Sequence, residues 1–300
     1  MNKMTRDRTF GSLAEPERMR QALGDQLPGF GRIEWLSVTG STNTDLGESL
    51  RAATPSTLQT LPWLRGAHLQ TAGKGRAGRA WANQPGHCLM FSVAMDSPVP
   101  IAALMGLPPV LGIAAVLALR KLLGTEIHHR LTLKWPNDLL WDQAKLAGIL
   151  VETVKHPSNP YPTIVAGIGL NLSGASHLAM EMARPIADWT QVRQADAANR
   201  EHPADAAMLV ASIALAWSNA LKRVAQTGFG GFLSDFQSMD ALAGQPVAVT
   251  DQGVVLMEGV ASGCDESGRL LLATAEGMRP VMVGDVSIRP VSGGFGNVIR

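Results

Sequence analysis

Cysteine is scarce in this sequence. Its 300 residues include 2 cysteines, Cys88 and Cys264, which lie far apart and form no C-x-x-C or Cys/His ligand spacing. Disulfide-rich domains and structural zinc sites need several closely spaced ligands, so both classes are excluded. The same scarcity favours a reducing, cytoplasmic compartment.

Charge is also low and balanced. Charged residues make up 17% of the chain, and the formal net charge is +1. Such a balance gives no sequence-wide attraction to nucleic acid or acidic lipid, so anion binding must rely on local basic clusters. A hydrophobic share of 46% over this length is typical of a folded chain with a sizeable core and room for two domains.

We expect no segment of the sequence to enter a membrane or direct export. The start, MNKMTRDRTFGSL, is basic without a following apolar run, which excludes a secretory signal. Residues 101–119 carry no charge and are long enough to raise the question of a membrane span. Pro108 and Pro109 interrupt them, and proline is tolerated in the first turn of a helix rather than in its middle. We therefore predict a buried helix from there to about Leu123.

Hydrophobic periodicity predicts an α+β fold with a mixed sheet. Strands are expected at residues 33–38, 66–71, 89–95, 131–135, 145–155 and 164–172, and helices at 16–23, 42–53, 109–123 and 204–225, with a short one ending at Phe236. The last two strands, joined by a proline-rich turn, predict a hairpin, which does not fit regular β-α-β alternation. Thr42 and Asp45 have the spacing of a capping box for the second helix.

From Gly244 the pattern of the chain changes. Short apolar runs such as PVAVT, RLLLATA and MRPVMVG alternate with turns, which is typical of a small β-barrel. We place the domain boundary near residues 239–243. The predicted organisation is an N-terminal extension over 1–32, a larger α+β domain over 33–240 and a small β domain over 241–292.

The most distinctive stretch is QTAGKGRAGRAW at residues 70–81. Glycines let backbone N–H groups approach a ligand closely, and the interleaved Lys74, Arg76 and Arg79 can offset phosphate charge. The string also satisfies G-x-G-x-x-G, which raises a nicotinamide-dependent dehydrogenase as an alternative. In a dinucleotide-binding site this fingerprint should open a helix, whereas here Pro85-Gly86 follows and indicates a loop. A solvated loop without a ligand stays a second alternative for this stretch taken alone.

Three further motifs follow, each modest by itself. KWPND at 134–138 ends a strand in a sharp turn that presents an amide and a carboxylate. KLAGILVE at 145–152 is an apolar strand led by a lysine, and GIGLN at 167–171 combines two glycines with an asparagine. Alone, each fits an ordinary turn, surface lysine or strand end.

Taken in order, these pieces, with STN at 41–43 and GDVSIR at 284–289, resemble the biotin protein ligase family. The resemblance covers residues 33 to 290. It implies a mixed-sheet catalytic domain similar to that of class II aminoacyl-tRNA synthetases, followed by an SH3-like β-barrel. It also implies the monofunctional type of ligase, without a DNA-binding domain.

The family's reaction has two halves. Biotin and ATP give biotinyl-5′-AMP and pyrophosphate, and a lysine of a biotin carboxyl carrier domain then takes the biotin. The resemblance therefore implies biotin and ATP as substrates, Mg²⁺ bound through the ATP phosphates, and a carrier domain of a carboxylase as protein partner.

The resemblance also assigns roles to individual residues at matching motif positions. Catalytic roles fall to Lys145, Arg76 and Asp138. Biotin binding falls to Ser41, Thr42, Asn43, Gln70, Gly73, Lys74, Arg76, Lys145 and Gly148. Binding of ATP and the adenylate falls to Gly75, Arg76, Arg79, Trp81, Asn137, Lys145, Asn171 and Arg289.

The sequence departs from the family pattern at three positions. Lys74 stands where arginine is usual, Ala77 where a further arginine is frequent, and Asp285 where a glutamate is usual. A lysine lacks the planar fork with which arginine holds a phosphate, so we expect weaker phosphate binding by the loop and unchanged chemistry.

Two related functions compete with this interpretation. Some family members also repress transcription through an N-terminal helix-turn-helix domain, but residues 1–32 show neither two long helices nor a basic stripe, so no DNA binding is expected. A lipoate or octanoate ligase or transferase has the same broad fold but lacks the basic glycine loop joined to KWPND.

Overall fold

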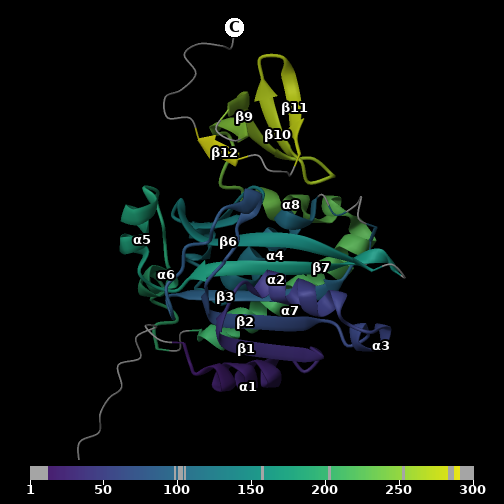
Figure 1. The fold of residues 1–300 in the computed structure, drawn as a ribbon. Coiled ribbons are helices and arrows are strands. Elements are labelled where there is room, and N and C mark those ends of the chain that lie inside the picture. Colours follow the sequence, from purple (N-terminus) through teal and green to yellow (C-terminus); the bar gives the residue numbers. More distant parts are fainter. Residues whose placement is uncertain are drawn as a thin grey trace, which may run out of the picture.

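The computed structural model describes residues 13–97, 99–100, 104, 106–156, 159–201, 204–251, 254–282 and 287–290. Its centre is a seven-stranded sheet in the order β1-β2-β3-β7-β6-β5-β4 (Figure 1). The strands are β1 (Arg32–Thr39), β2 (Trp63–Gln70), β3 (Cys88–Asp96), β4 (Leu131–Lys134), β5 (Asp138–Trp141), β6 (Ala144–His156) and β7 (Asn159–Asn171). Only β1 and β2 pair in parallel in this sheet, so it is mixed, as predicted.

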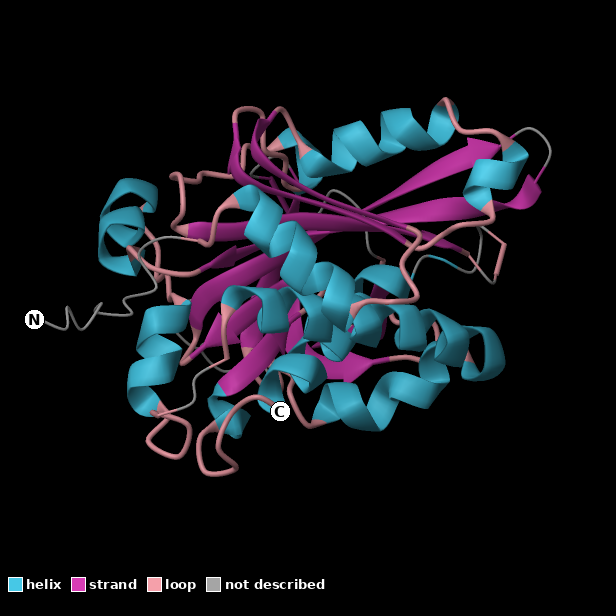
Figure 2. Ribbon diagram, turned by 90° about the horizontal axis from the view of Figure 1, so that it is seen from below, coloured by secondary structure: helices cyan, strands magenta, loops and turns pink. Residues whose placement is uncertain are grey.

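Helices cover both faces of the sheet (Figure 2). They are α1 (Pro16–Gln26), α2 (Thr42–Arg51), α3 (Pro55–Leu58), α4 (Leu107–Arg120), α5 (Ala175–Met182), α6 (Trp189–Ala195), α7 (Ala206–Thr227) and α8 (Leu233–Gln237). Because side chains alternate along a strand, Phe91 and Val93 of β3 join the core formed with α4 and α7, whereas Ala94 packs with Leu46 and Leu50 of α2. The α2 face, which carries fewer helices, is left to hold the site.

The predicted helix after the double proline is confirmed. It is α4, which begins at Leu107 with proline in its first turn, and nearly all of its side chains are buried. Among the described residues, no helix combines the length and apolar character needed to cross a membrane.

The short N-terminal helix is also confirmed, as α1, and it packs along the edge strand β1 (Figure 1). Met19, Leu23 and Leu27 enter the main hydrophobic core together with side chains of α7. Part of the segment expected to be an extension thus contributes to the core of the larger domain. Residues 1–12 lie outside the described chain, and the domain bounds remain a prediction.

The predicted capping box at Thr42 and Asp45 is wrong. Helix α2 begins at Thr42 with Ser41 as its N-cap, and no side chain caps it. Asp45 instead accepts a hydrogen bond from Thr39, and the Thr42 hydroxyl lies 2.7 Å from Ser92 Oγ. Both side chains thus make hydrogen bonds with residues outside α2 instead of capping it, and the Thr42 hydroxyl lies in the interior.

The C-terminal part forms a five-stranded antiparallel sheet in the order β11-β10-β9-β8-β12. Its strands are β8 (Pro246–Asp251), β9 (Val254–Cys264), β10 (Leu270–Thr274), β11 (Gly277–Val281) and β12 (Ser287–Pro290). This small β domain confirms the predicted class. The two parts share one core, and the buried Trp135 Nε1 donates to Gly268 O at 3.0 Å. Asp285 and the start of the GDVSIR motif lie outside the described residues.

The connection between the two sheets buries a carboxyl group. Residues around Asp240 pair with the edge strand β4, through Leu133 N to Met239 O at 2.8 Å and Ala241 N to Leu133 O at 3.0 Å. Asp240 Oδ1 accepts from Leu242 N at 2.9 Å, while Oδ2 is buried without a partner among the described residues. Burial raises the pKa of Asp240 to about 6, against the opposing effect of the Leu242 N–H.

Asp240→Asn should therefore stabilise the protein above pH 6. The folded-state pKa of Asp240 lies above its usual 3.8, so wild-type stability from this group is full below about pH 4 and is lost as the pH rises through 6. The asparagine stays neutral and keeps an acceptor for Leu242. Urea denaturation should show a gain of about 2–3 kcal/mol at pH 8 that shrinks toward pH 4; an equal difference at both pH values would contradict the assignment.

Candidate functional site

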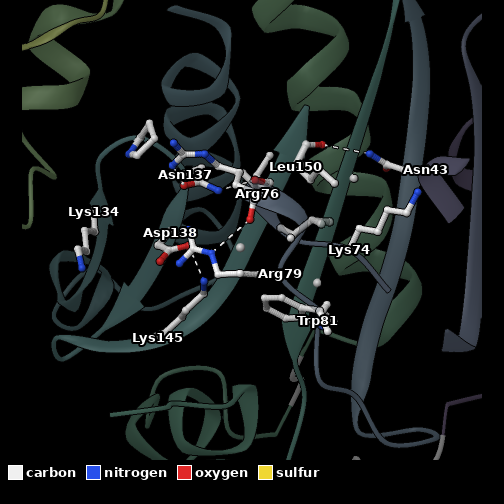
Figure 3. A pocket seen from close by; sticks show the side chains of 18 of the residues that line it. Asn43, Lys74, Arg76, Arg79, Trp81, Lys134, Asn137, Asp138, Lys145 and Leu150 are labelled. Carbon is white, nitrogen blue, oxygen red and sulfur yellow. Dashed lines mark hydrogen bonds and ion pairs between the residues drawn. The ribbon is translucent and has the colours of Figure 1, made fainter. Parts of the chain in front are cut away.

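A cavity of about 590 Å³ opens on the α2 face of the sheet, and residues of the glycine-rich loop form part of its lining (Figure 3). The residues that the sequence singled out and that line it are Ser41, Thr42, Asn43, Gln70, Lys74, Gly75, Arg76, Arg79, Trp81, Asn137, Asp138, Lys145, Gly148 and Arg289. They come from elements spread along both parts of the chain. Gly73 and Asn171 are the two predicted site residues that are not part of this lining.

One end of the cavity is neutral and densely hydrogen-bonded. The Thr42 backbone N–H donates to Gln70 Oε1 at 2.7 Å, and Ser92 Oγ donates to Asn43 Oδ1 at 2.6 Å. Ser41 is 4% exposed, Thr42 3% and Asn43 6%. Buried polar groups of this kind are matched to a ligand that has its own donors and acceptors.

The rest of the lining is strongly cationic. Its seven basic residues are Lys74, Arg76, Arg79, Lys134, Lys145, Arg184 and Arg289, against the single carboxylate Asp138. Burial lowers the pKa of Lys134, and the nearby Lys145, Arg184 and Arg289 lower it further against the attraction of Asp138. This excess of positive charge suits a polyanion such as a triphosphate.

The glycine-rich loop folds back on itself as a narrow hairpin. Trp81 N donates to Gly73 O at 2.9 Å and Gly75 N to Arg79 O at 2.6 Å, while Ala77 and Gly78 at the tip have positive φ angles of 54° and 67°. Gly73 thus holds the loop by its backbone. Residues 79–87, all of which the structure describes, form no helix between the loop and β3, whereas a dinucleotide fingerprint should open one.

Side chains anchor the loop at several points, one of which is Lys74, whose Nζ donates to Thr44 Oγ1 of α2 at 3.0 Å. Arg76 Nη1 donates to Asn137 Oδ1 at 3.0 Å, which joins the loop tip to the turn of the KWPND motif (Figure 3). At the base, Asn83 Nδ2 donates to Gln70 O at 3.0 Å and to Trp81 O at 3.2 Å. Asn83 was missed by sequence reasoning, because an asparagine in a loop gives no indication of its partners.

The Trp81 ring lies on a pair of glycines. Gly148 and Gly169 face each other across β6 and β7. A Cβ atom at Gly169 would lie 2.3 Å from Trp81 Cε2, and one at Gly148 would lie 3.1 Å from Trp81 Cζ3. The two glycines of KLAGILVE and GIGLN therefore create the flat floor on which an aromatic ring rests.

Lys145 lies in the cavity lining between Asp138 and the Trp81 ring. Its Nζ is 2.6 Å from Asp138 Oδ1 and 5.4 Å from the centroid of the Trp81 ring (Figure 3). Its backbone is held by Ala187 N, which donates to Lys145 O at 2.9 Å, and by Asn171 Nδ2 at 3.3 Å. The structure thus gives Asn171, which is 4% exposed, a role in holding Lys145 rather than a place in the cavity.

Lys134 and Arg184 also line the cavity, and the fully buried Ser92 contacts Thr42 of the lining; the sequence assigned none of the three to the site. Lys134 stood inside the KWPND motif without a role. Arg184 follows α5 and a left-handed residue, Ala183, and enters the cavity because the next residues pair with Lys145: Lys145 N donates to Pro185 O at 3.1 Å. No local pattern marks Arg184. Alternation along β3 could have indicated Ser92 as a polar position within a buried strand.

A resident metal ion does not fit this site. The described residues contain no cluster of three or more His, Cys, Asp and Glu side chains that could hold one. Asp138 is the single carboxylate of the lining, and it is already paired with Lys145.

Comparisons with known proteins identify the family to which this chain is similar. Residues 35–171 match the model of the biotin/lipoate A/B protein ligase family, and residues 243–289 match that of the biotin protein ligase C-terminal domain. The chain is 31% identical over 283 residues to the bifunctional ligase/repressor BirA of Escherichia coli, which covers 93% of this chain and 81% of the relative.

The chain belongs to the biotin protein ligase family. It is also 30% identical to the biotin–[acetyl-CoA-carboxylase] ligase of Mycobacterium tuberculosis, over 90% of this chain and 96% of the relative. The solved biotin protein ligase of Aquifex aeolicus in complex with biotin and ATP matches with a TM-score of 0.70 and 27% identity, over 87% of this chain and 100% of that one. Biotin protein ligases thus share this fold over both the mixed sheet and the small β domain.

Proposed function

We propose that this chain activates biotin with ATP to biotinyl-5′-AMP and transfers the biotin to a lysine of a biotin carboxyl carrier domain. The observation that supports it most is that one cavity combines a neutral, hydrogen-bonded group of side chains around Thr42 and Gln70 with seven basic side chains, among them Lys145. Biotin has a neutral ureido ring at one end and a carboxylate at the other, and ATP brings the phosphates.

The ureido ring is proposed to bind at Ser41, Thr42 and Gln70. Gln70 uses its Oε1 for Thr42 and leaves its Nε2 as a donor. A neutral polar ring that enters a buried site must have its donors and acceptors paired. The carboxylate at the far end of the ligand then lies toward Lys145 and Arg76.

In the first half-reaction, a biotin carboxylate oxygen attacks the α-phosphorus of ATP, the bond to the bridging oxygen breaks, and pyrophosphate leaves. Two anionic groups must approach each other, and donors fixed beforehand where charge develops lower the barrier. Lys145 is held by its backbone and by Asp138, and Arg76 by Asn137. Trp81, on its glycine floor, offers its face to the adenine.

In the second half-reaction, the ε-amine of a carrier lysine attacks the acyl carbon, AMP leaves, and the amine loses a proton. Asp138 is proposed to orient this amine or assist its deprotonation. The mixed anhydride is sensitive to water, so the loop over the cavity also has a protective role. Mg²⁺ is proposed to enter with ATP, bound to its phosphates, because the protein side offers only Asp138.

ATP–pyrophosphate exchange on the purified protein tests this proposal. We expect exchange that depends on biotin, is absent with lipoate, and is followed by labelling of one lysine when a biotin carboxyl carrier domain is added. Exchange with lipoate and none with biotin would instead support a lipoate ligase.

Arg184 gives a sharper prediction about the phosphates. Its charge lies close enough to Lys134 to lower the pKa of that residue, and the charge of Arg289 has the same effect. If it contacts the β- or γ-phosphate, Arg184→Ala should raise the KM for ATP by about tenfold, the worth of one charged hydrogen bond. Transfer from pre-formed biotinyl-5′-AMP should be unchanged, because that compound lacks both phosphates.

The matched control is Arg18→Ala, which removes an exposed arginine from α1, outside the cavity lining. It should change neither half-reaction. Slower transfer from biotinyl-5′-AMP in the Arg184 variant would place this guanidinium at the α-phosphate or the adenine instead.

A further inference from the structure

A chain of hydrogen bonds runs beneath the neutral end of the cavity. Glu152 Oε2 accepts from Asn43 Nδ2 at 2.8 Å, Asn43 Oδ1 lies 2.6 Å from Ser92 Oγ, and Ser92 Oγ lies 2.7 Å from Thr42 Oγ1. Gln70 completes the chain by accepting from the Thr42 backbone N–H. The chain thus connects an exposed carboxylate on β6 with the groups proposed to bind the ureido ring.

The middle of this chain is removed from water. Ser92 is 0% exposed, Thr42 3% and Asn43 6%. Above them, Gly167 leaves the room that Asn43 needs, because a Cβ atom there would lie 2.1 Å from Asn43 Oδ1. In such surroundings the direction of each hydroxyl is decided by its protein neighbours.

The carboxylate gives the chain a direction. It has acceptors and no donor, so Asn43 turns its nitrogen toward Glu152 at 2.8 Å, with Leu150 O as a second and much longer acceptor at 3.5 Å, and turns its oxygen toward Ser92. Ser92 then donates to Asn43 and accepts from Thr42. Thr42 consequently uses its one hydroxyl proton on Ser92 and offers only lone pairs to the cavity.

Gln70 is fixed independently by the backbone. Its Oε1 is 2.7 Å from the Thr42 backbone nitrogen, shorter than the 3.2 Å to Thr42 Oγ1. The Gln70 Nε2 therefore stays available as a donor. The neutral end of the cavity presents an acceptor at Thr42 beside a donor at Gln70.

We propose that Glu152 is a positioning residue that sets the direction of this chain and so selects ligands carrying an N–H next to a carbonyl oxygen. The inference rests on the proposed function, because the cyclic urea of biotin is such a group. Its N–H would donate to Thr42 Oγ1 and its carbonyl would accept from Gln70 Nε2.

Without the charge of Glu152, only the 3.5 Å contact with Leu150 O favours the present orientation of the Asn43 amide, and the chain has two directions. The Asn43 amide can turn over, Ser92 can donate to Thr42, and the Thr42 proton then points at the ligand's N–H. Two donors face each other in that state, which a ligand of fixed hydrogen-bonding pattern does not tolerate. Removing the carboxylate should therefore weaken binding of biotin and leave that of ATP alone.

The test compares Glu152→Gln, Ser92→Ala and the double variant. Biotin Kd is measured by calorimetry, and the KM values for biotin and ATP by pyrophosphate exchange. We expect Glu152→Gln to raise the Kd and KM for biotin by about tenfold, the effect of one mispaired hydrogen bond. The KM for ATP and the thermal midpoint should not change, because Glu152 is exposed. The double variant should be no worse than the weaker-binding single variant, since both break one chain.

The matched control is Glu48→Gln, which removes an exposed carboxylate of α2 that has no side-chain partner among the described residues. An unchanged biotin Kd in Glu152→Gln, additive losses in the double variant, or equal rises in both KM values would overturn the inference. Failure of the wild-type protein to bind biotin would overturn the proposed function itself. This failure is distinguishable from failure of the inference, because it is observed in the wild-type protein without any variant.

Discussion

Replacing Lys145 with glutamine should lower the rate of biotinyl-5′-AMP formation at saturating substrates by about 10²–10³-fold, the cost of one preorganised donor at developing charge. The Nζ atom lies in the cavity lining, 2.6 Å from Asp138 Oδ1 and 5.4 Å from the centroid of the Trp81 ring. Glutamine keeps much of the length of the side chain and removes the charge. Single-turnover formation of pyrophosphate from labelled ATP measures the effect.

The control for this variant is Lys222→Gln, which neutralises an exposed lysine of α7 outside the cavity lining. It should leave the single-turnover rate unchanged. A Lys145 variant with a raised KM for biotin or ATP and a normal maximal rate would show that Lys145 binds the substrates equally in the ground and transition states. That result would contradict a role in stabilising the transition state.

The layout of the sheet could be predicted because its strands and helices differ in period and length. Strand β3 is a continuous buried run, and α4 is a long apolar segment that begins at prolines. Strand β5 was missed, since residues 138–141 are short and follow a turn whose polar residues dominate the local pattern. Its place between β4 and β6 depends on pairing with both, which no local signal reports.

Within the site, motif residues were predictable in kind but not always in role. The structure brings Lys145, Asp138 and Trp81 together from three separate segments, and their roles remain predictions. Thr42 looked like a helix cap and is instead the end of a buried hydrogen-bond chain. Asn171 looked like a nucleotide contact and instead holds the Lys145 backbone. In both cases tertiary hydrogen bonds, invisible in the sequence, compete with the local interpretation.

Arg184 and Ser92 show a second limit of sequence reasoning. Each is placed by a strand register: Arg184 reaches the cavity because Lys145 pairs with the segment around Ile186, and Ser92 contacts Thr42 of the lining because its strand alternates between two faces. A residue type without a motif carries no information about such a register. The positive charge of a site can therefore be underestimated from the sequence, and for this lining no pattern in the sequence indicated Arg184.

Arg76→Gly should turn the enzyme into one that releases its intermediate. The Arg76 side chain links the loop tip to Asn137, and its loss removes a charged hydrogen bond that ties the tip of the loop to the turn of the KWPND motif. A bond of this kind contributes about 1–3 kcal/mol, so biotinyl-5′-AMP should dissociate roughly 10–100-fold faster. Free adenylate acylates exposed lysines, so added bystander proteins should become biotinylated.

Arg76→Lys separates charge from geometry in this experiment. Lysine keeps the positive charge and loses the planar fork, so it should retain the adenylate better than glycine and less well than arginine. Labelling of a bystander protein, read by streptavidin blot against labelling of the carrier domain, measures the leak. If the glycine variant retains the adenylate as the wild type does and labels only the carrier, the closure of the cavity does not depend on Arg76, and the hairpin hydrogen bonds from Gly73 to Trp81 must be sufficient for it.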